Sequence, residues 1–305
     1  MNEYEVAEKN MILKVRAGSY LYGTNTLESD EDYIGIFIPE EKYLLGLNKI
    51  EEVSKEDCDD KLYSLSKFAR LALDNNPNIL ELLFVDAEDV LYINDLGLDL
   101  LELKNSFLSQ NIKHRFLGYA FSQKKKMVTK LENYSDIYEA HYYLVNNKHN
   151  ENEIFLVDLL PSPLFERTKD MIKVGDISLP AAITIKKAIN TLKVRIEKFG
   201  DRKELVTRYG FDTKFALHLI RLITEGITLL RKGTLKFPLP NASFLMDIRN
   251  GVYSLDKILD ISDGLESIME RVYKYTKLPK KPDFSKINDF VIRAHKTKIC
   301  SKQEV

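Results

Sequence analysis

The sequence has little of what marks several common protein classes. Its 305 residues include two cysteines, Cys58 and Cys300, and no tryptophan. Two cysteines can form neither a four-ligand zinc site nor a disulfide framework, so we expect free thiols in a reducing compartment. No run approaches 18 apolar residues, and the charged N-terminus MNEYEVAEKN lacks the apolar core of a signal peptide. These absences predict a cytoplasmic protein with no membrane span.

What is present fits a globular chain with a substantial core. Apolar residues make up 44% and charged residues 30%, and the length suits one large or two ordinary domains. The charge is divided unevenly: residues 1–100 hold 22 acidic and 9 basic residues, and the remainder holds 24 and 36. An acidic part joined to a basic part favours two domains with different roles, one able to hold cations and one able to face a polyanion, although two solvated surfaces would give the same count.

The first hundred residues alternate strand and helix signals. Residues 11–17 and the run DYIGIFIP read as strands, and residues 59–65 as a third short extended piece. SKFARLALDNN and NILELLFVD have helical spacing of apolar residues. The pattern predicts a small α+β domain over residues 1–104.

Helical patterns dominate the rest of the chain. The segment PSPLFERTKDMIKVGDISLP, with three prolines, is expected to be the main long loop. The sequence therefore predicts a helical C-terminal domain over residues 105–305. The expected helices span 106–132, 134–147, 179–199, 212–232, 254–277 and 283–297.

The segment GSYLYGTNTLESDEDYIGIF, residues 18–37, is the most informative. Asp30 and Asp32 are two residues apart at the start of a strand, so both carboxylates are expected on one side, where they repel each other unless a cation lies between them. Hard divalent ions such as Mg²⁺ take such oxygen ligands and keep sites for phosphate oxygens. Gly18 allows close backbone approach, and Ser19 adds a hydroxyl and an N–H. A triphosphate could then lie between the Gly-Ser turn and the metal.

This combination of strand, Gly-Ser, a ten-residue spacer, Asp-x-Asp and strand resembles the signature of the DNA polymerase β-like nucleotidyltransferase superfamily. The segments YSLSKFARLALDNNPNILELLF and YGFDTKFALHLIRLITEGITLLRKGTL, with the later DIRNG, are similar to a large family of bacterial and phage nucleotidyltransferases associated with RNA repair. The resemblance covers about residues 14–260. It implies a small polymerase-β-type palm, with a mixed sheet and helices on one face, followed by a helical domain.

The resemblance also implies a third metal-binding carboxylate from a later strand. Asp59 and Asp60 are the main candidates, and Asp57 is a weaker one. Strand alternation puts Asp60 on the face of Leu62, which should pack inward, and so favours Asp59 on the open face with Asp30 and Asp32. The position relative to YSL matches the family's acidic residue at Asp59.

The implied chemistry is metal-dependent nucleotidyl transfer with Mg²⁺ or Mn²⁺ as cofactor and a nucleoside triphosphate (NTP) as substrate. The expected acceptor is a hydroxyl at an RNA end, such as that of a tRNA, with pyrophosphate released. Two alternatives stay open: modification of a protein hydroxyl, as in adenylylation, and a nucleotide- or RNA-binding module whose catalytic site has decayed. The presence of all three acidic positions argues against decay.

The segment from residue 213 to 232 is an amphipathic helix, with Asp212 as its expected N-cap and Gly233 just beyond its end. Lys214, His218 and Arg221 fall on one stripe with Glu225. Three such donors suit a triphosphate or an RNA phosphate, and the family has a K-x-A-x-H-L-I-R signature here, so they are candidate nucleotide-binding residues. An ordinary solvated face is the alternative.

A second basic run lies between residues 113 and 130, with aromatic residues interleaved. Such a pattern can follow a nucleic-acid backbone and stack on bases, or can be the solvated side of a helix. The candidate nucleic-acid contacts are Arg115, Lys124, Lys125 and Lys126.

Overall fold

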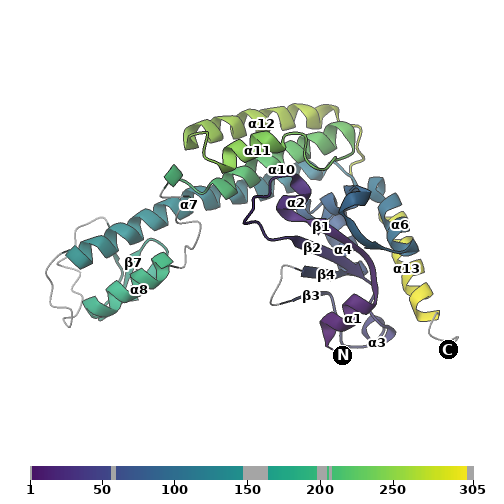
Figure 1. The fold of residues 1–305 in the computed structure, drawn as a ribbon, viewed down its shortest axis with the longest axis horizontal. Coiled ribbons are helices and arrows are strands. Elements are labelled where there is room, and N and C mark those ends of the chain that lie inside the picture. The colour runs from purple at the N-terminus through teal and green to yellow at the C-terminus, as the bar shows by residue number, and fades with distance from the viewer. Residues whose placement is uncertain (1, 56–59, 147–163, 198–204, 206–207, 301–305) are drawn as a thin grey trace. The chain divides into compact units, whose positions relative to one another are not determined.

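The computed structural model describes residues 2–55, 60–146, 164–197, 205 and 208–300 (Figure 1). The chain forms two compact units. The first comprises residues 1–120, 219–247 and 260–305, and the second comprises residues 121–218 and 248–259. Each unit thus collects segments that are distant in the sequence, whereas the sequence-based division at residue 104 follows the chain and stays a prediction.

The first unit is built on a mixed five-stranded sheet in the order β3-β4-β2-β1-β5. β2 and β4 are parallel, and the other neighbouring strands are antiparallel. The strands are β1 (Met11–Ala17), β2 (Asp32–Phe37), β3 (Glu52–Ser54), β4 (Asp60–Ser64) and β5 (Val90–Ile93). This sheet with its helices confirms the expected α+β class, because β1, β2 and β4 lie where the alternation predicts them.

The side chains of the central strands alternate between the two faces of this sheet. In the β1–β2 register, Leu13 pairs with Ile36 and Ala17 pairs with Asp32. Leu62 of β4 is fully buried in a cluster with Phe37 and with Val6 of helix α1 (Glu3–Lys9). Leu62 therefore points inward, as the alternation predicts.

Short helices connect and cover these strands. α4 (Leu65–Leu73) begins after Ser64, whose hydroxyl accepts from the Lys67 N–H at 3.3 Å, and it packs against β2 and β4. The other helices of this region are α2 (Gly18–Tyr22), α3 (Glu41–Leu44), α5 (Pro77–Leu80) and α6 (Asp95–Glu102), with 3₁₀ turns at Glu81–Phe84, Ala87–Asp89 and Lys104–Phe107.

Long helices make up most of the C-terminal part, as expected. Where two helices were expected between residues 106 and 147, one continuous helix of 35 residues forms instead. The helices are α7 (Ile112–Asn146), α8 (Ile185–Glu197), α10 (Thr213–Lys232), α11 (Ala242–Arg249), α12 (Leu255–Tyr275) and α13 (Phe284–Cys300). Among the described residues, none of the helices combines the length and the apolar character that a membrane span requires.

The second unit contains a small antiparallel sheet, β6 (Glu166–Arg167), β7 (Met171–Val174) and β8 (Ile177–Pro180). The expectation of a long loop is therefore wrong for this stretch, and the expected helix from residue 179 begins only at Ile185. Ile172, Val174 and Leu179 point inward and join a core with residues of α7 and α8. Gly175, at a φ of 53°, lies in the tight turn between β7 and β8.

Candidate active site

The Gly-Ser turn lies where β1 ends and α2 begins. Gly18 is the first residue of α2 and has a φ of 64°, a left-handed conformation that side chains rarely adopt. A Cβ atom built on Gly18 would overlap with the carboxylate oxygen Oδ2 of Asp32. Glycine is thus required at position 18 for two reasons, the backbone conformation and the space that the Asp32 carboxylate occupies. The neighbouring Ser19 is partly exposed, and its carbonyl accepts from the Thr24 N–H at 2.8 Å.

The Asp-x-Asp pair lies at the start of β2. Asp32 is the first residue of the strand and is partly exposed, while Asp30 is exposed and precedes the strand by two residues. Between them, Glu31 accepts a hydrogen bond from the Tyr33 hydroxyl and has an oxygen 3.8 Å from Arg16 Nε. Arg16 and Tyr33 are paired in the β1–β2 register, on the face opposite to Asp32. Glu31 is therefore engaged away from Asp32.

Of the candidates for the third carboxylate, Asp60 lies within the described residues, and Asp57 and Asp59 lie outside them. Asp60 is paired with Tyr33 in the β2–β4 register, so it too lies on the face opposite to Asp32. Its oxygen Oδ2 accepts from Lys14 Nζ at 2.7 Å and from the Tyr4 hydroxyl at 3.0 Å. Asp60 is 8% exposed and serves as a buried anchor for α1 and β1.

The donor set at this edge of the sheet suits a hard divalent ion. Asp30 and Asp32 offer carboxylate oxygens only, and the glycine beside Asp32 leaves its carboxylate uncovered by a side chain at position 18. Within the described ranges, no group of three or more His, Cys, Asp or Glu side chains is placed to hold a metal ion. Two of the expected ligands fall in those ranges, and Asp59 does not.

Helix α10 has the ends that the sequence predicts. Asp212 Oδ1 accepts from the N–H groups of Lys214 and Phe215 at 3.1 and 3.2 Å, which makes it the N-cap. Gly233 has a φ of 67° and closes the C-terminal end, with its N–H bonded to the Leu229 carbonyl. Lys214 and His218 are partly exposed on the first half of this helix.

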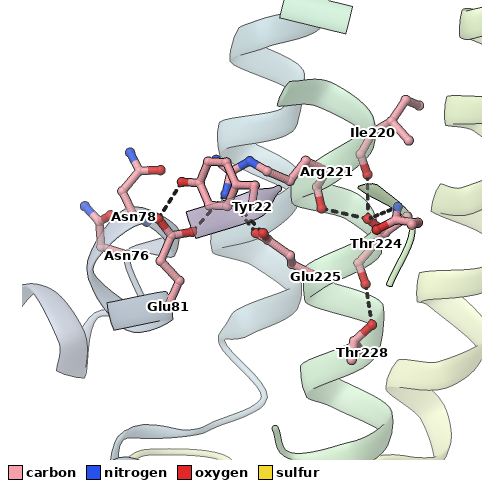
Figure 2. Close-up of polar contacts among 10 residues, drawn as sticks. Tyr22, Asn76, Asn78, Glu81, Ile220, Arg221, Thr224, Glu225 and Thr228 are labelled. Atoms are coloured by element: carbon pink, nitrogen blue, oxygen red, sulfur yellow. Dashed lines mark hydrogen bonds and ion pairs between the residues drawn. The ribbon is translucent and has the colours of Figure 1, made fainter. Parts of the chain in front are cut away.

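Arg221, expected on the same stripe, is instead buried in an ion-pair cluster of the first unit. Figure 2 shows Arg221 and Glu225 of α10 meeting Glu81 of the 3₁₀ turn and Tyr22 of α2. Arg221 Nη1 lies 2.8 Å from Glu81 Oε2 and 3.1 Å from Glu225 Oε2, and the three side chains are 3%, 2% and 1% exposed, respectively. The Tyr22 hydroxyl donates to Glu81 Oε1 at 2.6 Å. Nη1 of the guanidinium is thus held by two protein carboxylates, whereas the buried Nε has no hydrogen-bond partner in the described part of the chain.

This buried cluster joins one cation to two carboxyl groups, so it has one negative charge too many when both are ionised. Burial raises the pKa of Glu225 to about 8 and also raises the pKa of Glu81, although Arg221 opposes both shifts. Burial likewise raises the pKa of Tyr22. The cluster therefore favours holding one proton on its carboxyl pair at neutral pH.

Sequence reasoning did not find this cluster, although two signals were present. Arg221 and Glu225 have the i, i+4 spacing of a helical ion pair, and Glu81 interrupts the apolar run NILELLF. A charge inside such a run indicates a buried group with a partner. The partner itself, 140 residues away, cannot be read from the local pattern.

The basic run on α7 is divided between two roles. Arg115 forms an ion pair with Asp74 and also donates to the Asp74 carbonyl at 3.2 Å. Lys125 and Lys126 are exposed, Lys124 is partly exposed, and Lys126 lies over the Phe215 ring at 6.0 Å. A nucleic-acid role for these residues stays a prediction.

Comparison with known proteins identifies the family. A family model described as the RNA repair pathway DNA polymerase beta family, RlaP, matches residues 1–293. The chain belongs to the RlaP family. It is also similar to an uncharacterized 38.9 kDa protein encoded in the nrdC-mobD intergenic region of Enterobacteria phage T4. The two are 24% identical over an alignment of 342 positions, which covers 93% of this chain and 96% of the phage protein. No solved structure matches the chain.

Membership in the RlaP family confirms the resemblance to polymerase-β-type nucleotidyltransferases, over nearly the whole chain. It links the chain to RNA repair and to a superfamily that typically uses divalent metal ions and nucleotide substrates. In an RlaP protein, the Gly18–Asp32 arrangement is the described part of the expected catalytic centre.

Proposed function

We propose that this RlaP protein is a divalent-metal-dependent nucleotidyltransferase that moves a nucleoside monophosphate from an NTP to a hydroxyl at an RNA end, such as that of a tRNA. The observation that carries the proposal is the position of the Asp32 carboxylate directly over Gly18. This contact joins the two halves of the motif that are separated in the sequence. The family's link to RNA repair supports an RNA acceptor.

In this reaction the acceptor oxygen forms a bond to the α-phosphorus while the bond from that phosphorus to the β-phosphate oxygen breaks, and pyrophosphate leaves. Asp30, Asp32 and Asp59 would hold Mg²⁺ or Mn²⁺, which supplies charge stabilisation at the reacting phosphate when bound. Gly18 and Ser19 would leave space for the phosphates beside the carboxylates. Lys214 and His218 are the proposed further nucleotide contacts from α10.

Arg221 is not among the proposed nucleotide contacts. Because its guanidinium is held by Glu81 and Glu225, we assign it to positioning α2, the helix that begins at Gly18. Tyr22 is the last residue of that helix, and its side chain contacts both Arg221 and Glu81. The cluster would hold the Gly-Ser turn in place without touching the nucleotide.

The test is to incubate the purified protein with each α-³²P-labelled NTP, Mg²⁺ and total cellular RNA, and to separate RNA from protein afterwards. We expect label in RNA from the wild type and at least about 100-fold less from Asp32→Asn. Glu31→Gln is the matched control, because it removes the adjacent carboxylate that faces Arg16 and Tyr33, and it should keep activity. Label on a polypeptide would show that the acceptor hydroxyl belongs to a protein and not to an RNA. NTP binding with no label anywhere, from any NTP, would refute transfer and favour a binding module.

A further inference from the structure

A basic pocket lies in the first unit, between the end of α10 and the end of α12, outside the Gly18–Asp32 site. Its volume is about 730 Å³, and its lining includes Arg231, Lys232, Arg271, Tyr275 and Lys277. Its wall is held by hydrogen bonds from side chains to main-chain carbonyls, since the Thr276 hydroxyl donates to the Leu230 carbonyl at 2.6 Å. Gln110 of the segment before α7 donates to the Leu278 carbonyl at 3.0 Å.

The charge of this pocket has one sign. Residues 226–246 and 271–282, which include the basic residues of the lining, contain eight Lys and Arg residues and no Asp or Glu. The nearby Glu270 is already engaged, with Oε1 2.7 Å from Lys113 Nζ. Among the residues that the structure describes, Arg231, Lys232, Arg271 and Lys277 form no ion pair, and all four are exposed. Cations gathered without counter-charges create a positive potential that attracts a polyanion.

The same pocket presents an uncovered aromatic ring. Tyr275, the last residue of α12, is 84% exposed, although a tyrosine ring normally buries most of its surface. An exposed aromatic ring beside Arg and Lys side chains is the arrangement by which proteins bind single-stranded nucleic acid, with bases on the ring and phosphates on the cations.

The size and charge of the pocket select among anionic ligands. Its volume falls within the roughly 300–1,000 Å³ of small-ligand pockets, enough for unstacked nucleotides. Protein sites usually hold the metal ion of a bound NTP through one or two carboxylates as well as the phosphates, and the lining has no carboxylate. The cations extend over two chain segments, which suits successive phosphates of a polymer better than one triphosphate.

We propose that this pocket binds a single-stranded segment of the acceptor RNA, with phosphates on Arg271, Lys277 and Arg231 and a base stacked on Tyr275. The RNA class rests on the proposed function. The pocket is a separate site from the carboxylates, so RNA binding there does not require transfer.

The test measures binding of a fluorescein-labelled 12-nucleotide single-stranded RNA to the full chain by fluorescence anisotropy, between 50 and 200 mM salt. The variant Arg271→Gln/Lys277→Gln should bind about 10-fold more weakly at 100 mM salt, and the slope of log affinity against log salt should fall by about 1.4, or about 0.7 per lost phosphate contact. The matched control is Lys9→Gln/Lys49→Gln, which removes two exposed cations outside the pocket and should bind as the wild type does.

The stacking contact is tested separately. Tyr275→Ala should weaken RNA binding by about 5-fold or more, and Tyr275→Phe should retain it, because the ring and not the hydroxyl carries the contact. Excess ATP should not displace the RNA. Displacement by ATP, together with loss of ATP binding in the double variant, would instead make the pocket a nucleotide subsite and overturn the proposal.

Three further outcomes would also overturn it: no RNA binding by the wild type, equal losses in the two double variants, or equal RNA labelling efficiency, kcat/KM, in Arg271→Gln/Lys277→Gln and the wild type. Failure of the proposed function has a different signature, namely RNA binding that depends on Arg271 and Lys277 with no nucleotide transferred from any NTP. Asp32→Asn separates the two, because it should bind RNA normally and transfer at least about 100-fold less label.

Discussion

The guanidinium carbon of Arg221 lies 4.1 Å from the centre of the Tyr22 ring, and both side chains bind the same carboxyl group, that of Glu81. The contact joins helix α2, which begins at Gly18, to the long helix α10 (Figure 2). A cation stacked on an aromatic ring and paired with carboxylates away from water is a strong interaction once formed, and removal of one member leaves the others uncompensated.

Replacing Arg221 with methionine should therefore destabilise the protein severely. Glu81 and Glu225 would remain buried without their cation, which costs about 3–5 kcal/mol. Urea denaturation at pH 7 measures the change in the free energy of unfolding. Arg231→Met, an exposed arginine on the same helix, is the control and should stay within about 0.5 kcal/mol of the wild type. An equal effect of the two changes would contradict the role of the buried cluster.

The cluster should also make stability depend on pH. Burial raises the pKa of Glu225 to about 8, whereas the unfolded chain has an ordinary value near 4.3, so the folded protein binds one more proton between these values. Because the folded state gains that proton, the free energy of unfolding should fall as the pH rises from about 4.5 through about 8, by roughly a few kcal/mol. Denaturation at pH 6 and pH 9 measures the fall.

Two variants separate this effect from general titration of the protein. Glu225→Gln should flatten the dependence, since it removes the titrating group while keeping the size of the side chain. Glu270→Gln removes an exposed carboxyl and should leave the dependence as in the wild type. A steep fall that persists in Glu225→Gln would show that another group holds the proton.

Gly18→Ala should reduce nucleotide transfer about 100-fold while leaving the protein folded. The new methyl group must displace the Asp32 carboxylate, and a shift of about 1 Å at a reacting centre can reduce the rate about 100-fold. Pyrophosphate release gives the rate, and a thermal melt should show only a modest loss of stability. Gly118→Ala in α7 meets no atom within 4 Å and should keep full activity. Normal activity in Gly18→Ala would refute the proposed site.

The choice between Asp59 and Asp60 leads to opposite outcomes for two single changes. Asp60→Asn should lower stability, by about 1–3 kcal/mol, because Lys14 and Tyr4 lose their charged acceptor, and transfer should persist. Asp59→Asn should abolish transfer with little effect on stability. Activity assays and denaturation curves on the two variants decide the matter, and the reverse pattern would make Asp60 the metal ligand.

The parts of the fold that the sequence predicted are those where periodicity runs for several residues. β1 and β2 alternate over six or seven residues, and α10 has both caps in its sequence. The small sheet of residues 166–180 was missed because its strands have two to four residues, too few for a period to be recognised among three prolines.

The candidate site was predictable to the extent that it is local. Gly18 and Asp32 belong to one motif, and the structure adds only that they touch. Arg221 was expected to face a ligand because its stripe is polar, yet burial depends on what packs against the stripe. Glu81 and Tyr22 come from distant segments, so no local pattern could distinguish a ligand-facing arginine from a buried one.

The buried cluster also constrains how related chains can diverge. Replacing a complete buried ion pair with apolar residues of similar volume is often neutral or even stabilising, whereas losing one member is costly. The positions equivalent to 81, 221 and 225 should therefore change together among homologous chains, with an apolar residue at 221 accompanied by uncharged residues at the other two. Covariation among these three positions would show that evolution preserves the charge balance between the cation and the two carboxyl groups, which a single substitution disrupts.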